Sequence, residues 1–334
     1  MVGEMTITDF EYAGRKKKTK REEFLNEMNK IIPWDKYISE IDKFYYHNKL
    51  GRRPKDIKVM LKMYLMQIWF NLSDEGIEDA IYDSYAMKSF LGINFCEEQV
   101  PDATTLLHFR RKLEENNFNE KIFNYVNDKL SEAGLMMKGG TIVDATIISA
   151  PKSTKNKEHK RDEEMHSTKK GGNWYFGMKV HTGVDAGSGY AHTIIGTAAN
   201  VHDITQTQNL LRDDDEVCYG DSGYLSVENR KEIIDNKNFS NIKFIINKRP
   251  GYIKKLKKQT GIIWDKKIEQ TKSRTRGKVE HIYHIIKDIF GYRKTVYKGI
   301  VKNMNRLYML FTSANLLMCI RANRENEFLR CVTV

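Results

Sequence analysis

The chain has 334 residues, which is enough for two domains or for one large domain with an appended module. Its composition is that of an ordinary globular protein, with 40% hydrophobic and 30% charged residues and only five prolines, and it excludes a low-complexity chain. The formal net charge of +12 favours a polyanionic partner, with nucleic acid ahead of a membrane surface.

Three further features restrict the class of protein. The four cysteines lie far apart and none falls in a metal-binding spacing, so we expect reduced thiols in a cytosolic protein. The first residues include no apolar segment, which predicts that there is no secretory signal. The apolar stretch Leu307–Ile320 is too short to cross a membrane and is better explained as a core helix.

The first predicted unit, residues 1–21, ends in a run of basic residues from Arg15 to Arg21. A run of like charges is commonly a solvated tail. The same run would suit a flexible arm that contacts DNA phosphates. The sequence leaves both interpretations open.

Residues 22–136 are predicted to form an all-α domain. Apolar residues recur at helical spacing after Pro54, which is typical of a helix with one buried face. Ser73 and Asp102 stand directly before later helical patterns and are expected to cap them.

The helix expected after Asp102 includes two consecutive arginines, Arg110 and Arg111. If the short helices form a helix-turn-helix, these arginines would face DNA. Short helical bundles are also common in proteins that bind no DNA. An ordinary helical domain is therefore the alternative.

Residues 137–322 are predicted to form an α/β domain, followed by a tail at 323–334. Apolar runs separated by glycine-rich turns and helical patterns indicate a mixed five-stranded sheet flanked by helices, in the order of an RNase H-like fold. A long polar excursion interrupts the domain at 150–173. The strands are expected within 139–149, 174–185, 190–198, 215–221 and 242–247, and a late helix at 274–290.

The first of these strands contains an acid, Asp144, among isoleucines and valines that are apolar on both faces. A lone ionised carboxylate in such a strand costs several kcal/mol unless something pairs with it. Asp144 is therefore expected to hold a cation or a proton.

Two more acids occupy comparable places. Asp221 ends the fourth predicted strand, and Glu280 lies in the late helix. If the helix packs across the two strands, the three carboxylates converge. Oxygen ligands alone select hard cations, so the sequence predicts Mg²⁺ or Mn²⁺. Two such ions would suit an in-line phosphoryl displacement.

Basic residues accompany these acids. Arg276 and Lys287 lie four residues before and seven residues after Glu280, hence on roughly the same helix face, where a DNA backbone would run. Lys169 and Lys170 are candidate phosphate contacts at the end of the polar excursion. Trp174 follows them and could stack on a base, although an aromatic residue that begins a strand is more often part of the core.

Several segments together resemble one family. They are similar to bacterial insertion-sequence transposases of the DDE superfamily, in the group named after insertion sequence five, over nearly the whole chain. The segments are Arg53-Pro54, Leu72–Glu75, Val100–Thr105, Thr141–Pro151, Trp174–Lys179, Ala198–Asp203, Gly220–Tyr224 and Arg276–His281.

The resemblance implies that Asp144, Asp221 and Glu280 are the DDE triad and that they bind two Mg²⁺ ions. It also implies a Tyr-x2-Arg-x3-Glu-x6-Lys signature around the last acid. Arg276, Glu280 and Lys287 match this signature, but Ser273 stands at the tyrosine position. We include Lys278, within the same segment, among the expected DNA contacts.

The implied activity is DNA transposition. Water activated between the metal ions would cut the element's ends, and the exposed 3′-hydroxyl would attack target DNA. The expected partners are the terminal inverted repeats, target DNA and a second copy of the chain, with no membrane. The expected location is the bacterial cytoplasm, at the nucleoid.

Two alternatives stay open at this point. One is a metal-dependent nuclease of the same fold that cuts DNA without joining it. The other is a DNA-binding repressor whose acids are vestigial.

Overall fold

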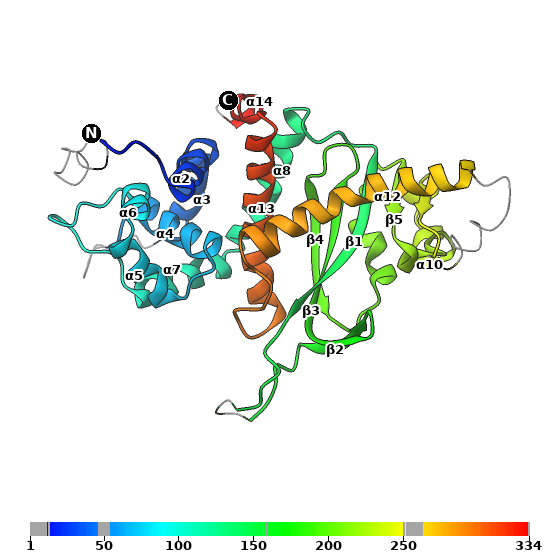
Figure 1. Cartoon of the computed structure of the whole chain (residues 1–334), viewed down its shortest axis with the longest axis horizontal. Coiled ribbons are helices and arrows are strands. Elements are labelled where there is room, and N and C mark those ends of the chain that lie inside the picture. The colour runs from blue at the N-terminus through cyan, green and yellow to red at the C-terminus, as the bar shows by residue number, and fades with distance from the viewer. Residues whose placement is uncertain are drawn as a thin grey trace.

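The computed structural model describes residues 12, 14–45, 54–155, 157, 159–249, 251 and 263–332. The first eleven residues of the predicted basic arm lie outside these ranges. The chain forms a helical region and a mixed sheet flanked by helices, and α13 (Ile300–Arg321) stands between them (Figure 1).

The helical region was predicted as such, and its caps are confirmed. The Ser73 hydroxyl accepts a hydrogen bond from the Gly76 amide at 2.9 Å, and Asp102 accepts one from the Thr105 amide at 2.7 Å. The helices are α2 (Lys20–Ile31), α3 (Trp34–Asp42), α4 (Ile57–Trp69), α5 (Asp74–Asp83), α6 (Tyr85–Leu91), α7 (Ala103–Glu115) and α8 (Phe118–Glu132).

The sheet has six strands in the described residues, one more than predicted. They are β1 (Gly140–Ser149), β2 (His166–Lys170), β3 (Asn173–Asp185), β4 (Ala191–Ala198), β5 (Val217–Gly220) and β6 (Lys243–Ile246). The order is β2-β3-β1-β5-β6, with β4 also paired to β3. β1 is antiparallel to β3 and parallel to β5.

The extra strand, β2, lies inside the predicted polar excursion. It pairs with the start of β3 through a turn at Gly171 and Gly172, both of which have positive φ. β2 is mostly exposed, so it has no apolar pattern by which the sequence could reveal it. This hairpin lies at the end of the sheet where the pairing of β3 with β1 stops, at Gly177, and β2 is labelled there in Figure 1.

The second half of the chain contains two long helices, α12 (Ile263–His284) and α13. A five-residue π-helical segment, Ile285–Ile289, continues α12. Several predicted α-helices are partly 3-10 helices. The short elements that make up the remainder are η1 (Asp203–Gln206), α9 (Thr207–Leu210), η2 (Ser222–Tyr224), η3 (Val227–Asn229), α10 (Lys231–Ile234), η4 (Lys237–Phe239) and α14 (Glu325–Val332).

One hydrophobic core extends from the N-terminal helices to α12, α13 and one face of the sheet, and a smaller cluster covers the other face. Buried polar contacts join the helical region to α13. The Trp69 indole donates to the Ser313 hydroxyl at 2.8 Å, and Arg306 bonds to the Gln67 carbonyl and to Asn71. The Leu307–Ile320 stretch is thus part of a core helix, as predicted, and none of the helices described is long and apolar enough to span a membrane.

The predicted DNA contact at Arg110 needs correction. Its side chain is buried and ion-paired with Asp74 of α5 at 2.5 Å, and it also bonds to Gln67 of α4. α7 therefore turns Arg110 inward, where a buried guanidinium requires the Asp74 carboxylate beside it. The neighbouring Arg111 is exposed.

Candidate active site

The site is built around Asp144 in the middle of β1. Asp144 pairs with Thr182 on β3, whereas pairing with β5 ends at Ile142. Beyond Ile142 the β5 side of β1 is therefore open to the residues that follow β5. The Asp144 carboxylate is only 14% exposed and accepts a hydrogen bond from the Ala145 amide at 2.8 Å.

Asp221 directly follows the last residue of β5. Its carboxylate caps η2 by accepting a hydrogen bond from the Gly223 amide at 2.7 Å. Because β1 and β5 are parallel neighbours, the turn that carries Asp221 follows β5 toward the same end of the strands as Asp144.

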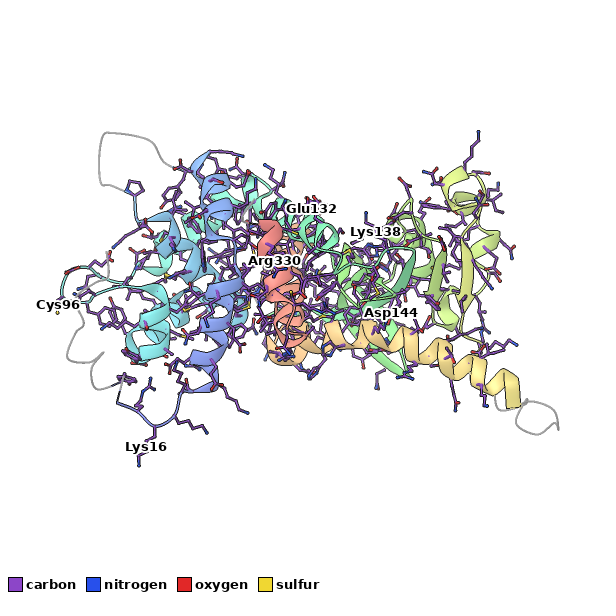
Figure 2. The ribbon with its side chains drawn as sticks, turned by 90° about the horizontal axis from the view of Figure 1, so that it is seen from above. Lys16, Cys96, Glu132, Lys138, Asp144 and Arg330 are labelled. Atoms are coloured by element: carbon purple, nitrogen blue, oxygen red, sulfur yellow. The ribbon has the colours of Figure 1, made fainter. Side chains whose placement is uncertain are left out.

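Glu280 comes from α12, which contacts both β1 and β5. The helix crosses the strands in Figure 1, and Figure 2 shows Asp144 beside it. The Glu280 side chain is 57% exposed.

Arg276 connects two of the acids. Its Nη1 atom lies 3.4 Å from Asp144 Oδ2 and 3.1 Å from Glu280 Oε1. Burial is the largest cause that raises the pKa of Asp144 to about 7. The carboxylates of Asp221 and Glu280 act in the same direction, while the Ala145 amide and Arg276 oppose the shift. Asp221 and Glu280 are thus both near enough to Asp144 to influence its charge.

Within the described part of the chain, no three acidic, histidine or cysteine side chains are close enough together to hold a metal ion. The donor set nevertheless suits a hard cation. It consists of carboxylates alone, and a guanidinium already lies where two of them need a positive charge.

Lys287 lies on the same side of the sheet. Its ammonium donates to the Thr146 hydroxyl at 2.6 Å and to the Ile147 carbonyl at 2.9 Å, and Thr146 shares the face of β1 that carries Asp144. Lys287 belongs to the π-helical segment, which changes the direction of side chains relative to a regular helix. Burial lowers its pKa, and the charge of Lys170 lowers it further.

Two other residues of α12 hold the helix in place. The Lys278 ammonium donates to the carbonyls of Ala186 and Gly187, each at 2.6 Å, in the turn that follows β3. Both bonds go to the protein itself, and the expected role of Lys278 as a DNA contact stays a prediction. Ser273, at the tyrosine position of the signature, accepts a hydrogen bond from Asn247 at 2.9 Å.

The β2–β3 hairpin carries the remaining predicted contacts. Lys169 pairs across the strands with Trp174, whose side chain is 63% exposed, so the alternative that Trp174 is a core residue is wrong. Lys170 is exposed and near enough to Lys287 to influence its pKa. The hairpin thus carries two exposed lysines and an exposed aromatic ring, and it places Lys170 near Lys287 of the π-helical segment.

Comparison with known proteins identifies the family. Residues 136–316, more than half of the chain, match the family model described as a transposase DDE domain. The chain belongs to the DDE transposase family. Residues 14–112 of this transposase match a second family model, also described as a transposase domain.

One solved structure has a similar chain trace. It is the synaptic complex of piggyBac transposase with hairpin DNA, with a TM-score of 0.45 and 12% sequence identity. The match covers 93% of this chain and 78% of that chain. From the family match, the protein is a DNA transposase, an enzyme that cleaves DNA, and its family uses divalent metal ions.

Sequence reasoning missed three hydroxyl groups of this transposase. Those of Thr182, Tyr224 and Tyr283 are buried, and the hydroxyls of Tyr283 and Thr182 interact with each other. Burial and the nearby Asp144 charge raise the pKa of both tyrosines well above its usual range. Tyr283 follows Glu280 by three residues, so helical spacing could have revealed that it lies under the site.

The raised pKa of Asp144 predicts a pH-dependent stability. Between about pH 4 and pH 7 the folded transposase binds a proton at Asp144 that the unfolded chain releases, so metal-free protein loses stability as pH rises through this window. Each pKa unit corresponds to about 1.4 kcal/mol. Asp144→Asn removes this loss and should gain stability relative to wild type as pH rises, up to about pH 7.

Urea unfolding in EDTA at several pH values measures this difference. Glu163→Gln, at an exposed position, is the control and should follow the wild type. The expected raised pKa of Asp144 would be contradicted if the difference in unfolding free energy between Asp144→Asn and wild type stayed constant from pH 4 to pH 8.

Proposed function

We propose that Asp144, Asp221 and Glu280 are the catalytic triad of this transposase and hold two Mg²⁺ or Mn²⁺ ions. The observation that carries the proposal is the contact of one Arg276 nitrogen with both Asp144 and Glu280. This contact joins two acids that are far apart in the sequence, at a point where their negative charges need a cation. The effect of Asp221 on the pKa of Asp144 adds the third acid.

Each acid is held in place by a different element of the fold. Asp144 is fixed by its strand, Asp221 by the turn after β5, and Glu280 by α12. Divalent ions bound by these carboxylates would supply positive charge to the scissile phosphate and activate the attacking oxygen. Lys287, held against β1, would orient the phosphate beside them.

We further propose that different parts of the chain bind different parts of the DNA. Residues 137–322 would carry out the chemistry, and residues 22–136 would bind the terminal inverted repeats, with Arg111 exposed on α7. The exposed basic residues of the 1–21 arm, Lys16 to Lys18 and Lys20, would contact phosphates. Because the two regions share one core, the bound end would stay in a fixed position relative to the triad.

The full reaction proposed is cleavage at the element's ends and joining of the 3′-hydroxyl to target DNA. Joining two ends requires two active sites, so we propose a homodimer on DNA that acts at the bacterial nucleoid. The site needs no separate nucleophile from the protein for either step, because water and the 3′-hydroxyl can attack at the same place.

Substitution of the triad tests this proposal. Asp144→Asn, Asp221→Asn and Glu280→Gln should each lower cleavage of a duplex from the element's end by at least about a thousand-fold in Mg²⁺, because charge stabilisation is lost in the transition state. DNA binding should remain. Asp235→Asn, at an exposed position in the same domain, is the matched control.

The same assay separates the alternatives. Joining of a precleaved end to a plasmid supports transposition, whereas cutting without joining supports a nuclease. If the wild type cuts nothing in Mg²⁺ and the triad variants behave like it, the repressor alternative holds and the triad proposal is wrong.

The hairpin generates a prediction about DNA binding. Changing Lys169 and Lys170 to Ala should reduce the dependence of DNA affinity on salt, by about 0.9 in the logarithmic slope for each phosphate that the hairpin no longer neutralises. Trp174→Ala should weaken binding by about 1–3 kcal/mol if the ring stacks on a base, with little change in slope. Lys243→Ala, exposed on β6, is the control. Unchanged affinity and slope in all variants would exclude the hairpin from the DNA interface.

A further inference from the structure

We infer that Arg276 is a built-in counter-cation of the triad, which blocks metal binding until DNA draws it away. The inference rests on the proposed metal site and adds how loading of that site is controlled. It predicts that DNA raises the affinity of the transposase for metal ions.

The Arg276 guanidinium occupies a position that a metal ion would need. A single nitrogen of Arg276 contacts Asp144 at 3.4 Å and Glu280 at 3.1 Å. These oxygens are the ones that a divalent ion would need as ligands, at about 2.0–2.1 Å for Mg²⁺. An ion shared by these two oxygens would need the place between them that the arginine nitrogen holds, and it would bring two like charges close together. Metal and guanidinium therefore compete for the two acids.

Three other cations on this part of the chain are bound elsewhere. Lys278 is bonded to the turn after β3, Lys287 to β1, and Lys272 to Glu269 at 2.9 Å. Of the cations described on α12, Arg276 is the one that contacts the acids of the proposed triad. Its place on the helix, one turn before Glu280, keeps it within reach of the site when it moves.

A DNA backbone is a suitable competing partner for Arg276. The side chain is 24% exposed, so it can turn outward without breaking the core. A guanidinium pairs with a phosphate through two parallel hydrogen bonds, which a carboxylate contact through one nitrogen does not provide. Turning toward phosphate would leave Asp144 and Glu280 without a counter-charge and open to a metal ion.

The thermodynamic consequence is coupling in both directions. If DNA raises the metal affinity by some factor, metal must raise the DNA affinity by the same factor. Away from DNA the arginine keeps the acids paired, so the transposase would hold little metal. Cleavage would then require that DNA is already bound.

Titration with Mn²⁺ tests the inference. Free Mn²⁺ is measured by electron paramagnetic resonance, with and without a precleaved duplex from the element's end and with no target DNA. Wild type should bind Mn²⁺ at least about ten-fold more tightly with DNA, a typical size for such coupling. Arg276→Gln should bind Mn²⁺ more tightly than wild type without DNA and should gain less when DNA is added.

Two controls separate charge from general damage. Arg276→Lys keeps the positive charge and should bind Mn²⁺ without DNA much as wild type does. Arg274→Gln removes an exposed arginine two residues away and should also match wild type. The inference is overturned if Arg276→Gln, folded as judged by circular dichroism, binds Mn²⁺ no more tightly than wild type without DNA.

The triad variants distinguish failure of this inference from failure of the proposed function. If Asp144→Asn and Glu280→Gln abolish Mn²⁺ binding but Arg276→Gln has no effect, only the inference about Arg276 is wrong. If the acid variants bind Mn²⁺ as wild type does, the proposed metal site is wrong and the inference fails with it.

Discussion

The ion pair of Asp144 with Arg276 is the interaction on which the site depends. A carboxylate in the central strand of a sheet is strongly destabilised, and burial is the largest cause of the raised pKa of Asp144. A cation beside it offsets this cost, and Arg276 fills that role in the structure. An arginine and a metal ion can each supply the positive charge that a buried carboxylate requires.

The position of α12 follows from the same requirement. Three side chains hold the helix across the sheet, and each reaches a different part of it. Ser273 meets Asn247 after β6, Lys278 meets the turn after β3, and Lys287 meets β1. Glu280 lies between these attachments, so its backbone is fixed over Asp144 although its carboxylate stays exposed. The hydrophobic core around α13 also packs against this helix, and it continues into the N-terminal helices.

Much of this arrangement could be predicted from the sequence. The apolar run around Asp144, the glycines beside Asp221 and the helical spacing from Arg276 to Lys287 are local patterns, and they predicted the fold class. The family was indicated by the resemblance of several segments to known transposases. Other features depend on contacts between distant segments. Arg110 and Arg111 look alike in sequence, but only the structure shows that Asp74 draws one of them inward. Likewise β2 is polar on both faces, and the π-helical segment leaves no mark in the residue pattern.

The most direct test of the metal site is anomalous diffraction from crystals of the transposase bound to a precleaved DNA end and soaked with Mn²⁺. The proposed site predicts anomalous peaks ligated by Asp144, Asp221 and Glu280, with Arg276 turned from the acids toward a DNA phosphate. Manganese bound at a place that none of these three acids reaches would contradict it. So would Arg276 still in contact with Asp144 and Glu280 while both acids hold the ion.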